Sequence, residues 1–209
     1  MEQLAHKWAQ KIGTALNADQ EKIAVMAYGL TALLQLLLIF AAALLFGLLF
    51  GFLWEAMIVF FSVGFLRRLI GGAHAGTFNG CMVISVVCIV LFSALAHYVL
   101  PLCGFWAVCI ASVLIDLLAS FLIYRYAPVD SPNKPVRSPE KIRRLRRGAG
   151  TVMAAFILLT VVLLFLSYRN SVWFSYIWAF DLSVLWQVCM LTAMGRRLIC
   201  VVDHLIKVP

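Results

Sequence analysis

The sequence predicts an all-α polytopic membrane protein with about six transmembrane helices, the second of them short, and an amphipathic helix at the N-terminus. Hydrophobic residues make up 64% of the 209 residues, and the mean hydropathy is +1.00. Only 12% of the residues are charged, whereas soluble domains carry about a quarter. No hydrophilic stretch is long enough for a second folded domain, so residues 1–209 are expected to form a single membrane-embedded unit.

Residues 1–27 are predicted to lie as an amphipathic segment in the inner membrane interface. Leu4, Trp8, Ile12 and Leu16 recur every four residues, with lysines beside them. The segment does not resemble a cleavable signal peptide, because its charged lead is long and no small-residue cleavage site is apparent.

Apolar runs of membrane length follow, separated by turns and charged stretches. Gly47, Gly51 and Glu55 mark a turn within the long apolar stretch 29–66, which leaves a short second span. The predicted spans are 29–48, 53–66, 82–100, 105–124, 149–167 and 172–194.

Basic residues predict the orientation of these spans. With a cytoplasmic N-terminus, 16 of the 17 Lys and Arg residues lie inside and only Arg169 lies outside. Both termini and the segment 67–81 are therefore expected on the cytoplasmic side of a plasma membrane. Because orientation explains the net charge of +8, nucleic acid is not an expected partner.

The segment 67–81 contains the most informative pair of residues, His74 and Cys81. An imidazole that accepts a proton and a thiol that attacks a carbonyl are the groups of a cysteine nucleophile. Asn79 is a suitable helix cap, which would place Cys81 in a first helical turn, where the helix dipole stabilises a thiolate. Arg67 and Arg68 add positive charge nearby.

The spacing of the pair requires a bend. In a continuous helix, residues seven apart lie about 10.5 Å apart along the axis, too far for a hydrogen bond between imidazole and thiol. Glycines at 71, 72, 76 and 80 give the backbone the freedom to fold back. One His and one Cys are too few for a structural zinc site, so neither a metal nor another cofactor is expected.

The six cysteines do not indicate disulfides. Cys88, Cys109 and Cys189 lie inside apolar runs, where a thiol behaves as a small hydrophobe, and Cys200 is predicted to be cytoplasmic.

Together these residues resemble the AgrB family, the membrane endopeptidases that process the propeptides of Gram-positive quorum-sensing systems. The resemblance rests on Arg67-Arg68, on Gly71-Gly72-Ala73-His74-Ala75, and on Cys81 with Ser85 one helical turn later. The stretch 126–135, which leads into a basic segment, is similar to the cytoplasmic loop of the same family.

The resemblance implies that Cys81 is the nucleophile and His74 the general base. The substrate would be an AgrD-like amphipathic propeptide, cut on the C-terminal side of its signalling segment through an acyl-enzyme thioester. A thiol or hydroxyl of the peptide would then close a thiolactone or lactone ring. The residues that shape the loop would be Arg67, Arg68, Gly71, Gly72 and Ser85. The group that orients His74 stays open among Asp116, Asp130 and Asp181.

The basic segment 125–147 has two interpretations. It could hold the loop inside and contact anionic lipid. Alternatively, it could attract the acidic tail that substrates of this family often carry. The residues concerned are Lys134, Lys141, Arg143, Arg144, Arg146 and Arg147.

Two other classes of function are compatible with the composition. Polar residues within spans, such as Gln35, suggest a small transporter or exporter, and a non-catalytic membrane interaction protein is the second alternative. Neither explains the glycine-rich segment with His74 and Cys81. Because the second span is short, pairing with another copy in a homodimer would complete the enclosure of the helices.

Overall fold

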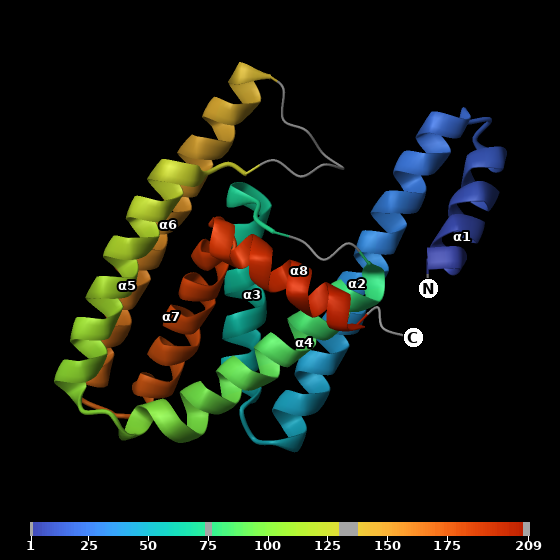
Figure 1. Ribbon diagram of the computed structural model, residues 1–209. Helices are drawn as coiled ribbons and strands as arrows, with labels where there is room; N and C mark the ends of the chain where they lie inside the picture. Colours follow the sequence, from blue (N-terminus) through green and yellow to red (C-terminus); the bar gives the residue numbers. More distant parts are fainter. Residues whose placement is uncertain (1, 74–76, 130–137, 207–209) are drawn as a thin grey trace.

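The computed structural model describes residues 2–73, 77–129 and 138–206, and within these ranges the chain is helical with no strand (Figure 1). The prediction of an all-α protein is confirmed. The α-helices are α1 (Glu2–Ala15), α2 (Gln20–Leu49), α3 (Leu53–Ile70), α4 (Phe78–Ala94), α5 (Phe105–Tyr126), α6 (Pro139–Ser167), α7 (Trp173–Cys189) and α8 (Ala193–Ile206). The short turns η1 (Leu95–Val99) and η2 (Leu100–Leu102) continue α4.

Four described helical segments are long and apolar enough to cross a membrane: α2, α4 with its continuation to Leu102, α5 and α6. A fifth results if α7 and the first part of α8 are taken together, although they meet at an angle of 94°. The short helix α3 carries three charged residues in its 18 positions and is not among them. The polytopic membrane class is confirmed, but the predicted span 172–194 is not one continuous helix.

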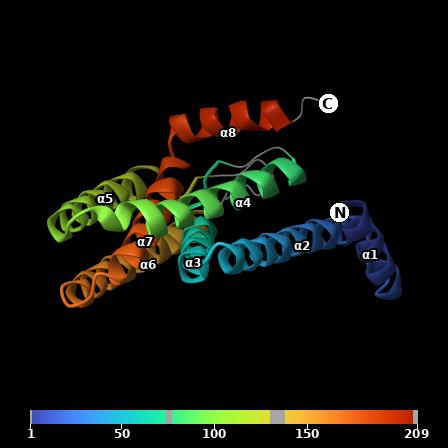
Figure 2. The ribbon, with the colours of Figure 1, turned by 90° about the horizontal axis from the view of Figure 1, so that it is seen from below.

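The break after α7 has a local cause. Thr192 accepts a hydrogen bond from the backbone N–H of Gly195, at 3.3 Å, and so caps the start of α8. Gly195 lies so close to the carbonyl of Cys189 that a Cβ at this position would collide with it. The chain therefore turns sharply, and α8 runs back alongside α4 (Figure 2).

Helix α2 begins well before the first predicted span. Asp19 caps it by accepting a hydrogen bond from the backbone N–H of Lys22 at 2.8 Å, and its other carboxylate oxygen lies 3.1 Å from Lys22 Nζ. These two contacts hold the pKa of Asp19 below its ordinary value. The predicted segment 1–27 is thus divided between α1 and the first turns of α2.

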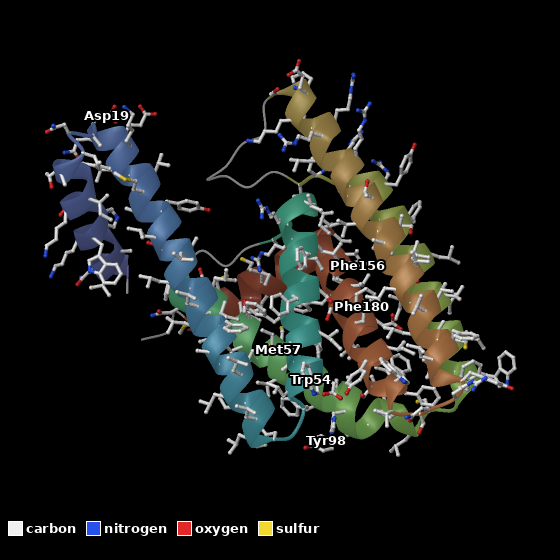
Figure 3. The ribbon with its side chains drawn as sticks, turned by 180° about the vertical axis from the view of Figure 1, so that it is seen from behind. Asp19, Trp54, Met57, Tyr98, Phe156 and Phe180 are labelled. Carbon is white, nitrogen blue, oxygen red and sulfur yellow. The ribbon has the colours of Figure 1, made fainter. Side chains whose placement is uncertain are left out.

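Helix α1 packs antiparallel against this first part of α2. Ala9, Ile23 and Ala27 are buried in their contact, whereas the apolar face with Leu4 and Trp8 is exposed. Figure 3 shows Asp19 at the tip of this hairpin, well separated from the helices that surround α7. The exposed apolar face agrees with the predicted amphipathic helix.

Helix α6 likewise begins ten residues before its predicted span. Ser138 occupies the N-cap, Pro139 the first helical position and Glu140 the first turn, which are typical helix-start residues. The basic residues 141–147 therefore lie on the first turns of a helix, and the prediction that they form a loop is wrong.

The core is built around α7, which is buried along most of its length and packs against α3, α5 and α6. Phe180 of α7 faces Phe156 of α6, with ring centroids 4.7 Å apart (Figure 3). By contrast, α2, α5 and α6 expose rows of large apolar side chains, such as Leu45, Leu117 and Phe165. Faces of this kind suit contact with lipid.

Candidate active site

The glycines after α3 allow the chain to turn against two other segments. Gly71 has a φ of +74° and Gly72 a φ of +133°, both in the region that favours glycine. A Cβ on Gly71 would collide with the carbonyl oxygen of Val129, and one on Gly72 would lie 3.3 Å from the Cβ of Met190. The start of the loop thus packs closely against the chain that follows α5 and against the end of α7.

Three hydrogen bonds hold this turn in place. Gln187 Nε2 of α7 donates to the carbonyl of Gly71 at 2.8 Å. The backbone N–H of Ala73 donates to the carbonyl of Met190 at 3.0 Å, and that of Val129 donates to the carbonyl of Ile70 at the same distance. The residue immediately before His74 is therefore tied to the end of α7.

Cys81 lies in the first turn of α4. Thr77 is the N-cap, and its side chain accepts a hydrogen bond from the backbone N–H of Gly80 at 3.1 Å. The N–H of Cys81 donates to the carbonyl of Thr77 at 3.1 Å. The prediction that Asn79 caps this helix is wrong by two residues, because Thr77 has the extended backbone of a cap. Cys81 is half-buried at the helix N-terminus, where the dipole favours an anion.

A cavity of about 130 Å³ extends from Cys81 between five helices. Helices α2, α3 and α4 form its walls, and the end of α7 and Ile199 of α8 complete it. Apart from Arg67 and Ser85, the lining is apolar or contributed by cysteine: Leu36, Ile39, Val59, Phe60, Val63, Gly64, Ala73, Cys81, Ile84, Cys88, Ile89, Phe92, Trp186, Met190 and Ile199.

Several of the residues singled out in the sequence meet at this cavity. Arg67, Cys81 and Ser85 line it, and Ala73, the residue before His74, lines it as well. Arg68 lies exposed in the last turn of α3 and is not part of the lining. His74 itself lies outside the described residues, as do Asp130 and Lys134.

The basic residues of α6 are exposed on its first turns and line no part of this cavity. Arg146 has a structural partner, because its Nε donates to the carbonyl of Ala127 at 3.1 Å and so links the start of α6 to the end of α5. The remaining described members of the group are Lys141, Arg143, Arg144 and Arg147.

The two intramembrane aspartates lie elsewhere in the core. Ser112 of α5 donates to Asp181 of α7 at 2.6 Å, and Asp181 is only 1% exposed. Neither Asp181 nor Asp116 lines the Cys81 cavity. The hydrogen bond between Ser112 and Asp181 therefore links α5 to α7 and does not contact the site. In the described part of the chain, no three His, Cys, Asp or Glu side chains form a group that could hold a metal ion.

The end of α7 is the part of the site that the sequence analysis missed. Trp186 and Met190 line the cavity, and Gln187 holds the loop. The one available signal was Gln187, a buried amide inside a predicted span, where a polar side chain requires a partner.

Comparison with known proteins places these features in a family. The model of the family "Accessory gene regulator B" (AgrB) matches residues 5–191. An AgrB-like protein of Clostridium perfringens strain SM101 is 28% identical over 97% of this chain and 96% of its own length. One from Halalkalibacterium halodurans is 30% identical over 78% of both chains. No solved structure matches the chain.

Proposed function

Because the chain belongs to the AgrB family, we propose that it is a membrane cysteine endopeptidase that processes an AgrD-like propeptide for quorum sensing. The observation that carries this proposal is the position of Cys81, which stands in the first turn of α4 and in the wall of a cavity shielded by five helices. A nucleophilic thiol needs this combination of a favourable electrostatic position and access to a bound substrate.

In the proposed reaction, His74 takes the proton of the Cys81 thiol and the sulfur attacks the scissile carbonyl. The peptide C–N bond breaks, the new amine receives the proton from His74, and the acyl group remains on sulfur as a thioester. A thiol or hydroxyl within the same peptide then gives its proton to His74 and attacks the thioester. The new acyl bond closes the ring, the bond to sulfur breaks, and the departing Cys81 thiolate recovers the proton from His74. An intramolecular attack outcompetes water through its high effective concentration, and apolar walls reduce hydrolysis further.

Close packing around the loop supports this assignment. Gly71 and Ala73 are fixed to Gln187 and Met190, so the residue before His74 is held at the same cavity as Cys81. A base and a nucleophile must be positioned to within a fraction of an ångström to act together. The bonds from α7 therefore serve to hold the loop in a productive position.

The site is proposed to face the cytoplasm, where the propeptide is made. In Figure 1 the end of α3, with Arg67 and Arg68, lies toward the same side as the start of α6 with its basic residues. A positive surface of this kind suits the inner face of a bacterial plasma membrane. The exposed cations of α6 would also attract an acidic peptide tail. Added salt should screen this attraction, and the KM for the propeptide should therefore rise.

Co-expression with an AgrD-like propeptide tests the proposal. Wild-type protein should yield a cyclic product and a Cys81 adduct detectable by mass spectrometry, whereas Cys81→Ala and His74→Ala should yield neither. Cys109→Ala is the matched control, because Cys109 lies on α5 and does not line the cavity. Full cleavage by Cys81→Ala would exclude the proposed nucleophile. Export of uncleaved peptide would favour a transporter.

A further inference from the structure

The cavity beside Cys81 is a slot that follows α4. Cys81, Ser85, Cys88 and Phe92 line it on successive turns of this helix. With a rise of 1.5 Å per residue, the slot extends about 16 Å along α4, from Cys81 to Phe92. Arg67 and Ala73 lie with Cys81 at one end, and Val59 lies with Phe92 toward the other. The thiol thus stands where the slot meets the loop.

When the peptide is attached to Cys81 as a thioester, the side chain of its last residue branches from the carbon next to the thioester carbonyl. That side chain must therefore enter the space next to the sulfur, and the slot is the space that the described residues leave there. Its lining is almost entirely apolar beyond the first turn: Val63 and Ile84 belong to it, and Trp186 packs edge to face on Phe92, with ring centroids 5.6 Å apart. A charged or strongly polar side chain would lose its hydration there without gaining partners.

The size of the slot restricts the occupant further. Its volume of about 130 Å³ is slightly below the ~150 Å³ of an apolar protein cavity known to accept benzene. A side chain of the size of leucine, methionine or phenylalanine fits such a space, and alanine would leave most of it empty. Poor filling of an apolar pocket weakens binding through lost contacts.

We propose that this slot is the specificity pocket for the peptide residue whose carbonyl Cys81 attacks, and that it selects a medium to large apolar side chain. The inference rests on the proposed function. The side chain anchors the acyl group against α3 and α4 and orients the thioester carbonyl toward the loop. A filled slot also keeps water away from the thioester until the ring closes.

Gly64 provides a way to fill the slot without disturbing the fold. It lines the cavity from α3, and a Cβ built on it meets no other atom within 4 Å. A leucine at this position would project into the open space and occupy the place of the substrate side chain. Gly29 of α2 is the matched control, since it is also helical and open but does not line the cavity.

The experiment measures kcat/KM of the wild type, Gly64→Leu and Gly29→Leu with propeptides that carry phenylalanine, leucine, alanine or aspartate at the acyl-side position. Wild type and Gly29→Leu should favour phenylalanine or leucine over alanine by at least about 10-fold, the scale expected for a few methylenes in an apolar pocket, and should exclude aspartate. In Gly64→Leu, the ratio of the phenylalanine to the alanine rate should fall by at least about 10-fold.

The outcomes separate this inference from the proposed function. If the wild type cleaves all four peptides at equal rates, the slot does not bind this side chain. If Gly64→Leu slows every peptide by the same factor, the slot holds something other than the substrate side chain, such as a lipid chain or a side chain from a second copy of this protein. Both results overturn the inference and leave the peptidase intact. If no peptide is cleaved and no Cys81 adduct forms, the proposed function itself fails.

Discussion

The two ends of the α3–α4 pair are closed in different ways. At the end away from Cys81, side chains close the gap: Glu55 is only 3% exposed and lies 2.9 Å from Nδ1 of His97. Tyr98, next in the π-helical turn η1, donates to the carbonyl of Phe50, and its ring meets that of Phe52 edge to face. Figure 3 shows Tyr98 and Trp54 together at this end.

At the other end, hydrogen bonds to backbone carbonyls hold the loop that joins the two helices. The carbonyls of Ile70, Gly71 and Met190 take part in the bonds that position the loop, and the side chains leave a cavity between the helices. The difference indicates a division of roles. Side-chain packing fixes α3 and α4 relative to each other at one end. The two helices therefore keep their relative position even though a cavity lies between them beside Cys81 at the other end.

The largest effect is expected from Gly71→Ala, which changes the loop at the Cys81 end of the α3–α4 pair. The positive φ costs about 1–2 kcal/mol for a residue with a Cβ, and the collision with the carbonyl of Val129 forces the loop to move. Because a shift of about 1 Å can cost a factor of 100 in rate, we expect peptide cleavage to fall by at least about 100-fold. Cleavage kinetics measure the loss of rate, and thermal unfolding in detergent measures the loss of stability.

Gly29→Ala serves as the control for this variant, because it exchanges a helical glycine that has open space around it. It should retain activity and gain about 0.5–1 kcal/mol of stability. If Gly71→Ala cleaves as fast as Gly29→Ala, the loop does not need its observed geometry.

A loss of stability of about 2 kcal/mol, without a loss of activity per folded molecule, is expected from Glu55→Ala at the end away from Cys81. The substitution removes the partner of His97 and leaves a small void, at a cost of about 2 kcal/mol. Apparent Tm should fall, whereas the cleavage rate per folded molecule should stay the same. Glu55→Gln, which preserves the volume and can still hydrogen-bond, should lose less. A strong loss of cleavage with unchanged Tm would contradict the division of roles.

The smallest change in free energy is expected from Gln187→Leu, which removes one of the hydrogen bonds to the loop. Loss of a hydrogen bond costs about 1 kcal/mol, which corresponds to about a fivefold change if the bond acts mainly on the reacting geometry. Gln187→Glu keeps the volume but cannot donate to Gly71, so its kcat should fall as well. Full kcat in the glutamate variant would show that packing, rather than the hydrogen bond, positions the loop.

The helices and their membrane character could be predicted from the sequence because hydropathy and the length of apolar runs carry this information directly. Boundaries could not be predicted as well. Apolar runs mark where a helix meets lipid, but α2 and α6 continue past the lipid-facing stretch on helix-start residues such as Asp19 and Pro139. These helix-start residues are visible in the sequence. They favour helix in the polar stretches 20–28 and 139–148, which the sequence analysis had left outside the predicted spans.

The site could be predicted only in its local part. Cys81 was identified from its pairing with His74, Arg67 and Ser85 from the resemblance to the AgrB family, and the structure brings all three to one cavity. The contributions of Gln187 and Trp186 could not be predicted, because they depend on α7 reaching the loop from more than 100 residues away in the chain. Long-range contacts of this kind leave little trace in a single sequence, apart from a buried polar side chain that needs a partner.

The turn between α7 and α8 has a consequence for how the cavity opens. The peptide carbonyl of Met190 holds Ala73, the residue before His74, and three residues later the chain has turned by about a right angle into α8, whose Ile199 lines the cavity. One short joint therefore carries both the cover of the cavity and the anchor of the loop. Any swing of α8 that uncovers the cavity pulls on the same peptide group, so that admission of the substrate and alignment of the loop are mechanically linked.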